Sequence, residues 1–429
     1  MTASVKSTTY RKLTPKGTAL TRQEIIHHQR ARMFAAMTDV VAERGYSGTT
    51  MLALRKSAHV SSEAIYREFP TKDAYFAATY EFIARLAIVT VSRAYRAEQD
   101  RTAQLRSAFD AFAQLVVHEP KAARLATVEA LGAGPTMLEP MERVSRAFES
   151  LIESSFIKAP DGVTLPPLVA RGIVGGISRV TRQLLLERRE NELPALAAIL
   201  VNWALSYHCA DALALPHPPT PTSQQLPPAP SPDGHPDSSR ILQSAAWIAA
   251  TSGYPSLTIS RIVQIAKVPD NAFFALYESR EQCFMDSYDL MGAEVVATAA
   301  EAALEGTDWI DSIQRGVTAL MSRVGHDPVF ARCAFIEVFA AGCIGIERRS
   351  RLMDKFAALL MSRVPSDARP PEIVAEAIVG AVWHVAHQYV ARNATQQLPQ
   401  LAHHAAYLVL APIIGGEAAM NRILASPHT

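Results

Sequence analysis

The stretch "AHVSSEAIYREFPTKDAYF" (58–76) decides how this chain is interpreted. It places two serines, a glutamate, a tyrosine and an arginine on one very short segment. Ser61 is a good helix N-cap, because its hydroxyl can accept a hydrogen bond from a backbone N–H of the first turn. Pro70 cannot continue a helix. The residues between them, "SEAIYREF" (62–69), are therefore predicted to form a short helix with a polar start.

Two more helices are predicted directly before this segment. The first ends at Gly45, a residue type that suits the position after a helix C-terminus. Thr49 or Thr50 then caps a second helix, "MLALRKSA" (51–58), and the chain turns at His59. Two short helices joined by a tight turn and braced by a preceding helix form a helix-turn-helix.

In a helix-turn-helix, the first residues of the last helix face base edges in the major groove. The residues at that position here are Ser61, Ser62, Glu63 and Ala64. Glu63 can accept a hydrogen bond from a cytosine amino group. The groups suited to phosphate contacts are Tyr66, Arg67, Lys72 and the backbone N–H groups after Thr50.

Charge is concentrated at the same end of the chain. Residues 1–77 contain twelve basic and six acidic side chains, a net charge of +6, whereas the whole chain has a net charge of +1. A local excess of positive charge is the electrostatic footprint of DNA binding. The near-neutral total excludes a polycation that binds nucleic acid along its whole length.

The second half of the chain repeats the first. Residues 45–76 align without a gap on residues 253–284, a shift of 208 positions. At the same shift, "HEPKAARLATVEALGAG" lies on "HDPVFARCAFIEVFAAG", and "GIVGG" lies on "AIVGA" at a shift of 205. Three ordered matches at nearly one offset indicate a duplicated domain of about 200 residues.

A proline-rich segment, "LPHPPTPTSQQLPPAPSPDGHPDS" (215–238), separates the copies. Its nine prolines forbid a helix and favour polyproline II. The predicted domains are a basic flexible arm (1–21), a helix-turn-helix head (22–76), a helical regulatory body (77–214), the linker (215–238), a degenerate second head (239–284) and a second body (285–425).

Each copy is predicted to be all-α. Apolar residues recur at helical spacing, and no alternating strand pattern of useful length is present. The helices expected after the first head span 73–97, 103–117, 121–132, 139–157, 167–188 and 194–212.

The stretch "AERGYSGTTMLALRKSAHVSSEAIYREFPTKDAYF" (42–76) resembles the TetR/AcrR family of bacterial transcriptional regulators. The resemblance rests on the Gly-Tyr pair, the two threonines, Val-Ser, the aromatic residue two turns into the helix, and Phe-x-x-Lys. It implies two tandem TetR-like units, each with a three-helix DNA head and a helical body for ligand binding and dimerisation.

The resemblance also implies roles for single residues. By position, Thr50, Tyr66 and Lys72 match phosphate contacts of the family, and Ser62 and Glu63 match base contacts. His59 departs from the pattern, since the family usually has glycine in the turn, although histidine tolerates a left-handed backbone better than most residues.

The second head departs further from the pattern. Pro269 and Asp270 replace the two serines, Phe274 replaces Tyr66, and Ala275 replaces Arg67. Four basic and three acidic residues between Ser238 and Met285 give a net charge of only +1. Asn271 can still read adenine. Contact between this head and DNA therefore stays open.

The predicted function is a DNA-binding transcriptional regulator, with a repressor as the expected form and an activator left open. Its partners would be double-stranded operator DNA, bound by the first head, and an unknown small apolar effector, bound by the helical bodies at about 75–165 and 283–365. The alternative is a sensor or interaction protein that kept the scaffold and does not bind DNA.

No nucleophile, dinucleotide or P-loop motif is present, so neither an enzyme nor a cofactor is expected. No metal is expected either, because His384 and His387 have no third ligand at a suitable spacing.

The expected location is the cytoplasm. No stretch approaches the length of a membrane span, the N-terminus lacks the apolar core of a secretory signal, and no C-x-x-C spacing occurs. The small-residue faces at 172–176 and 377–381 permit close helix approach, either across a dimer or within one core. The expected assembly is an internal pseudo-dimer within one chain, with a homodimer of chains as the alternative.

Overall fold

The computed structural model describes the chain except for residues 1–21, 158–162, 211–214, 232–234 and 426–429. The predicted basic arm (1–21) lies outside the described residues. The regular elements of the described residues are helices, apart from one antiparallel pair of two-residue strands, β1 (Val163–Thr164) and β2 (Cys209–Ala210). The all-α class is therefore confirmed. The small ladder was not expected, because a two-residue strand is too short to show alternation.

The first half follows the predicted helices closely. Its elements are α1 (Arg22–Gly48), α2 (Met51–Ala58), α3 (Ser62–Glu68), α4 (Lys72–Arg96), α5 (Arg101–His118), α6 (Pro120–Arg124), the π-helix η1 (Leu125–Glu129), α7 (Ala130–Gly132), η2 (Pro135–Met137), α8 (Leu138–Ile157), α9 (Val169–Glu187), η3 (Glu190–Leu196) and α10 (Ala197–Leu205). Gly45 has φ 68° and interrupts α1 where the first helix was expected to end. The helix predicted over 194–212 is too long, since α10 ends at Leu205.

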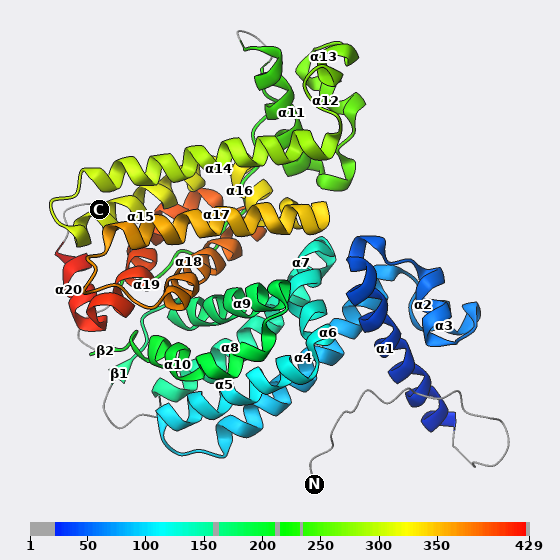
Figure 1. Cartoon of the computed structure of the whole chain (residues 1–429), viewed down its shortest axis with the longest axis horizontal. Coiled ribbons are helices and arrows are strands. Elements are labelled where there is room, and N and C mark those ends of the chain that lie inside the picture. Colours follow the sequence, from blue (N-terminus) through cyan, green and yellow to red (C-terminus); the bar gives the residue numbers. More distant parts are fainter. Residues whose placement is uncertain (1–21, 158–162, 211–214, 232–234, 426–429) are drawn as a thin grey trace.

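The second half contains a similar series of elements. They are α11 (Asp237–Ser252), η4 (Tyr254–Ser256), α12 (Ile259–Ala266), α13 (Asp270–Phe274), α14 (Arg280–Leu304), α15 (Trp309–His326), α16 (Pro328–Phe335), η5 (Glu337–Ala341), α17 (Gly342–Arg363), α18 (Glu372–Ala391), η6 (Thr395–Leu401), α19 (Ala402–Ile414) and α20 (Gly416–Leu424). Figure 1 shows the three-helix groups α1–α3 and α11–α13 projecting separately from a central mass of body helices.

Apolar side chains gather in three buried clusters. One lies inside α1–α4 and includes Leu54 and Ile65, and a second lies inside α11–α14. The third and largest contains side chains from both halves, among them Trp203 of α10 and Tyr389 of α18. Because buried apolar surface is the main stabilising contribution in folding, the two bodies stabilise each other through one shared core.

The closest contact between the halves joins α9 and α18. A Cβ atom at Gly175 would lie 2.2 Å from the Cβ atom of His384, and one at Gly380 would lie 2.7 Å from the Cβ atom of Arg179. Neither position can hold a larger residue without a shift of the facing helix. These glycines belong to the small-residue faces seen in the sequence, and the two helices lie next to each other in Figure 1.

The described part of the proline-rich linker lies against the second half. Proline has no N–H group, so the backbone of this segment mainly offers carbonyl acceptors. The Tyr389 hydroxyl donates to the Pro219 carbonyl at 2.8 Å, and the Trp247 indole N–H donates to the Pro227 carbonyl at 2.9 Å. The linker is therefore held on the surface of α18 and α11 over these residues.

Helix α4 corrects one expectation from the sequence. By length and composition α4 could cross a membrane, although no stretch was expected to approach that length. A third of its apolar window is buried in the structure. The helix packs against α1, α5 and α8 and contributes Tyr75 and Phe76 to the core of the first head.

We expect Gly175→Ala to lower the free energy of unfolding by about 1–3 kcal/mol, because the added methyl group would overlap the side chain of His384. Calorimetric melting of the full chain measures this effect. Ser178→Ala, on the same helix, is the control and should leave the midpoint nearly unchanged. An equal midpoint for Gly175→Ala would show that α9 and α18 are not packed at this distance.

Candidate nucleic-acid interface and ligand cavity

Side-chain caps fix the two short helices of the first head. The hydroxyl of Thr50 accepts a hydrogen bond from the backbone N–H of Ala53 at 3.2 Å, at the start of α2. The hydroxyl of Ser61 accepts one from the backbone N–H of Ala64 at 3.1 Å, at the start of α3. Caps of this kind stabilise a helix by about 0.5–2 kcal/mol. Both caps agree with the sequence prediction.

The turn between α2 and α3 has a left-handed backbone at His59, with φ 52° and ψ 47°. The carbonyl of His59 accepts a hydrogen bond from Arg32 Nη2 at 2.7 Å, which ties the turn to α1. The second three-helix group has the same arrangement. Lys267 has φ 50°, and its carbonyl accepts a hydrogen bond from Arg240 at 3.4 Å. The turn therefore tolerates non-glycine residues in both groups.

Helix α3 presents a polar surface to solvent. Ile65 and Phe69 are buried in the core of the head and fix the helix in place. The residues that stay exposed, called the recognition face from here on, are Ser61, Ser62, Glu63, Tyr66 and Arg67. Positions 62, 63, 66 and 67 lie on one side of a helix, so the structure brings together these residues as the sequence predicted.

Two members of the recognition face are well placed to contact a partner. The side chain of Tyr66 is 53% exposed, a high value for an aromatic residue. Arg67 forms no hydrogen bond or ion pair with any residue that the structure describes. Thr50, also exposed, stands at the N-terminus of the neighbouring helix α2. Helix N-termini and arginine side chains both bind phosphate.

Lys72 is held differently from the other predicted contact residues. Its Nζ donates to the carbonyl of Tyr46 at 3.1 Å and lies 4.0 Å from the centre of the Tyr46 ring. Burial lowers the pKa of Lys72, and the carboxylate of Asp73 opposes this effect. The Tyr46 hydroxyl in turn donates to Asp73. Lys72 thus joins the end of α1 to the start of α4, in addition to any role on a surface.

The second three-helix group repeats the contacts that hold the first group together, but it lacks the polar residues of the recognition face. Arg280 takes the position of Lys72 and donates to the carbonyl of Leu257. Pro269 stands at the start of α13 and provides no side-chain cap. Phe274, the counterpart of Tyr66, is 60% exposed. The surface of this group that corresponds to the recognition face is therefore largely apolar, apart from Asp270 and Asn271.

A glutamate links each three-helix group to its body. The backbone N–H of Tyr46 donates to Glu129 Oε2 at 2.9 Å, and the N–H of Tyr254 donates to Glu337 Oε2 at 2.8 Å. Burial raises the pKa of Glu337, although the Tyr254 N–H and Arg332 oppose this effect. Neither glutamate was predicted from the sequence. Their repetition at the 208-residue shift is the signal that could have identified them.

The first body contains a large cavity. Its volume is about 1440 Å³, and it is lined by α1, α4, α5, α6, α8, α9 and α10. Its walls are mainly apolar, with aromatic side chains from Phe34, Phe82, Phe109, Phe112 and Phe148. Residues of the second half, on α17 and α18, close its inner end. In the second body, α14, α15 and α17 meet through buried side chains such as Val295, Met321 and Leu352.

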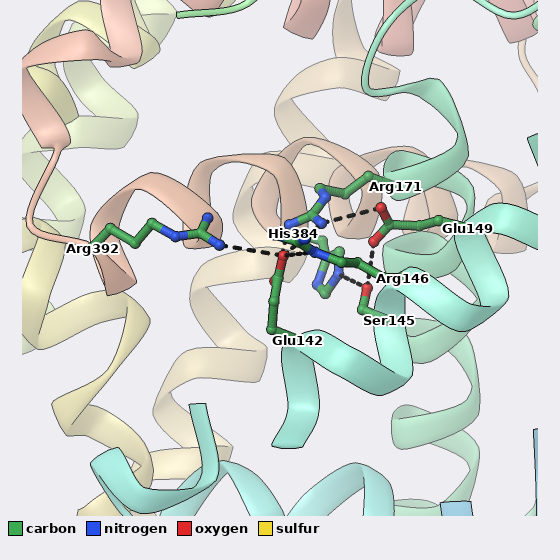
Figure 2. Close-up of polar contacts among 7 residues, drawn as sticks. All are labelled: Glu142, Ser145, Arg146, Glu149, Arg171, His384 and Arg392. Carbon is green, nitrogen blue, oxygen red and sulfur yellow. Dashed lines mark hydrogen bonds and ion pairs between the residues drawn. The ribbon is translucent and has the colours of Figure 1, made fainter. Parts of the chain in front are cut away.

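A network of charged residues closes one side of the cavity (Figure 2). Its centre is Glu142 of α8, which binds Arg171 at 2.9 Å, Arg146 at 3.0 Å and Arg392, the residue directly after α18, at 3.4 Å. Burial raises the pKa of Glu142, but its bonds to Arg171 and Arg146 and the charge of Arg392 outweigh this and lower it to about 2. Glu142 is therefore ionised at neutral pH and joins both halves.

The same network reaches α18 through a histidine. The hydroxyl of Ser145 donates to Glu149 at 2.7 Å and lies 3.1 Å from His384 Nε2, as Figure 2 shows. Burial lowers the pKa of His384 to about 3, and the charges of His387 and nearby arginines add to this effect. His384 is therefore neutral at physiological pH and contributes a hydrogen bond rather than a charge.

Comparisons with solved structures give modest similarities to transcriptional regulators. The regulator FadR from Bacillus subtilis, solved in complex with stearoyl-CoA, has a TM-score of 0.38 and 15% identity, over 41% of this chain and 97% of its own. The fatty acid degradation regulator FadR from Bacillus halodurans has a TM-score of 0.36 and 16% identity, over 41% of this chain and 97% of its own. A TetR-like regulator from Rhodococcus sp. RHA1 has a TM-score of 0.34 and 23% identity, over 43% of this chain and 96% of its own.

Sequence comparison assigns the first head more directly. None of the curated proteins matches the chain. Residues 35–79 match the sequence family described as "Bacterial regulatory proteins, tetR family". These residues run from α1 through α2 and α3 into α4, so they contain the recognition face and its frame. The chain thus carries a tetR-family N-terminal domain at residues 35–79.

Proposed function

We propose that this chain is a ligand-responsive transcriptional repressor of the cytoplasm, built from two TetR-like units. The first head (22–76) binds operator DNA, and the helical bodies (77–214 and 285–425) respond to a small effector. The observation that carries this proposal is the recognition face, a set of exposed polar residues on a short capped helix that is otherwise anchored in a core.

The recognition face suits a DNA major groove. With α3 in the groove, Ser62 and Glu63 at its N-terminus are the residues that reach base edges. Their short or acidic side chains allow close approach and can accept hydrogen bonds from cytosine. Tyr66, Arg67 and the N-terminus of α2 at Thr50 then lie beside the phosphates, which set position rather than sequence preference.

The two heads are proposed to be unequal. The second head repeats the turn, the glutamate link and the cation beside the tyrosine ring, but it presents Phe274 where the first head presents Tyr66. An exposed phenylalanine cannot bind phosphate by a hydrogen bond. One competent head per chain implies an operator without two-fold symmetry.

The effector is proposed to act through the wall shared by the head and the cavity. Phe34 of α1 and Phe82 of α4 stack with ring centres 4.9 Å apart, and both line the cavity. A ligand that separates these rings changes the angle between α1 and α4, which carry the head. Such a ligand weakens DNA binding if it prefers the displaced arrangement.

We expect Arg67→Ala to weaken binding to all duplexes and to reduce the slope of log affinity against log salt concentration by about one, since it removes one phosphate contact. Glu63→Ala should instead change which base is preferred, by about 1–3 kcal/mol of discrimination. Fluorescence anisotropy with labelled duplexes at several salt concentrations measures both effects.

The second head supplies the matched control. Alanine is introduced at the exposed positions of 61–67 in one variant and of 269–275 in another, with Ile65 and Phe273 kept because both are buried. The first variant should lose DNA binding and the second should retain it. Equal losses would contradict the unequal heads. Failure of the unmodified chain to bind any duplex at low salt would favour the alternative, a sensor or interaction protein.

The assembly is proposed to be an internal pseudo-dimer. The contact of α9 with α18 is extended by two buried tyrosines, since the Tyr207 hydroxyl donates to the Leu408 carbonyl and the Tyr407 hydroxyl donates to the Tyr207 carbonyl, both at 2.8 Å. These hydrogen bonds extend the pairing of the two bodies within one chain.

Light scattering on the free protein should therefore give a mass near 46.7 kDa, the mass of one chain. The measurement is made over a dilution series, because pairing of chains would depend on concentration. A stable species of about twice this mass would contradict the internal pairing and would favour a homodimer with two competent heads and a palindromic operator.

A further inference from the structure

The inner end of the cavity holds positive charge that the described protein does not neutralise. Arg182 of α9 and Arg349 of α17 both line the cavity there, together with His384 and His387 of α18. We call this the arginine end. It lies where the two halves of the chain meet, because α9 belongs to the first half and α17 and α18 belong to the second.

Arg349 is a buried cation, and no carboxylate among the described residues pairs with it. Its side chain is 6% exposed, and its Nε has no hydrogen-bond partner among the described residues. Its Cζ lies 5.1 Å from the ring centre of Phe339 and 5.2 Å from that of Trp383. Aromatic faces attract a cation but do not neutralise it. Burial and the charges of Arg182 and Arg179 lower the pKa of Arg349.

Arg182 is half-buried, and the described residues leave its charge unpaired as well. Its Nε donates to the carbonyl of Thr127 at 2.9 Å, and no carboxylate in the described part of the chain pairs with it. Burial, followed by the charge of Arg179, lowers the pKa of Arg182 to about 10, so it remains protonated at neutral pH. Two like charges thus stand at one end of a mainly apolar cavity.

Neighbouring arginines at the same interface are neutralised, which makes these two exceptional. Arg179 pairs with Asp354 at 2.9 Å and with Glu376, and Arg171 pairs with Glu142 and Glu149. An unpaired buried charge is strongly destabilising, whereas a paired one is tolerated. A bound anion can therefore supply the negative charge that the two unpaired arginines lack.

Other polar groups at the arginine end also lack partners. Trp383 Nε1 and Gln388 Oε1 are buried without a hydrogen bond to any described residue, and both residues line the cavity. Burial lowers the pKa of His387 to about 4, so the neutral ring can donate one hydrogen bond without adding charge. Buried polar groups without partners are rare in folded proteins.

We propose that the effector is an amphipathic anion whose carboxylate or phosphate head binds Arg182 and Arg349 and whose apolar part lies between α4, α5 and α8. Guanidinium groups bind both kinds of head through paired N–H donors. The volume of about 1440 Å³ exceeds that of most small-molecule pockets and accommodates a long apolar chain. The effector role rests on the function proposed above, whereas anion binding itself does not.

The proposed position of the anionic group places it in contact with both halves of the chain. Arg182 belongs to the first half and Arg349 to the second, so one anion bridges the two halves. Its apolar part, at the other end of the cavity, contacts Phe82 and Leu86 of α4, the helix that follows the DNA head. A single ligand would thus fix the second half and displace the first head.

Calorimetric titration of the full chain, without DNA, tests the proposal with three probes of one chain length: decanoate, decyl phosphate and decanol. We expect at least one of the anions to bind tenfold or more tightly than decanol. The tighter anion identifies the head group. In the double variant Arg182→Met, Arg349→Met this advantage should disappear, while decanol binds as before.

Arg351→Met is the matched control, because Arg351 lies on the same helix, is exposed and pairs with Glu347. It should bind decanoate like the unmodified chain. Arg349→Met alone should keep or raise the melting midpoint, since it removes an unpaired buried charge. A marked fall in the midpoint would overturn the proposal, as would anion binding no tighter than decanol, or an anion advantage that persists in the double variant.

The same probes with DNA present separate this inference from the proposed function. If an anion binds through the two arginines but does not weaken duplex binding, the anion site stands and the effector role fails. If decanol weakens duplex binding as strongly as the anions do, the function stands and the anionic class of effector fails.

Discussion

The contact between α9 and α18 is the constraint on which the rest of this structure depends. Gly175 and Gly380 let two helices from opposite halves approach until backbone and Cβ atoms touch. That approach merges the bodies into one core and brings Arg349 of the second half to the cavity of the first. A cavity that sits in one half is therefore completed by the other, and the ligand proposed for it depends on both.

The heads show a division between frame and surface. The frame recurs in both groups: a left-handed residue in the turn, an arginine on its carbonyl, and a glutamate that holds the N–H after a positive-φ glycine. These groups form hydrogen bonds that stabilise each head and attach it to its body. Within the recognition face only Ser61 helps to hold the head together, as the cap of α3. The side chains of the other members are free of that role, and apolar residues replace some of them in the second head.

The sequence predicts well whatever depends on near neighbours. The caps at Thr50 and Ser61, the turn at His59 and the bounds of α2 all follow from a few adjacent residues. It predicts poorly what depends on distant contacts. The sequence suggests that Lys72 is a free phosphate-binding cation, yet its Nζ donates a hydrogen bond to Tyr46, 26 residues earlier in the chain. In the same way, whether Arg349 finds a partner depends on helices far away in the chain. The end of α10 was misplaced for the same reason, because Tyr207 leaves the helix to bond the second half.

One competent head per chain, as proposed, makes a specific demand on the operator. Selection of bound duplexes from a random pool by the full chain tests it. We expect enrichment of a single motif without two-fold symmetry, and loss of that enrichment when the exposed residues of α3 are replaced by alanine. Enrichment of a palindrome with two equal half-sites, or no enrichment at all, would contradict it.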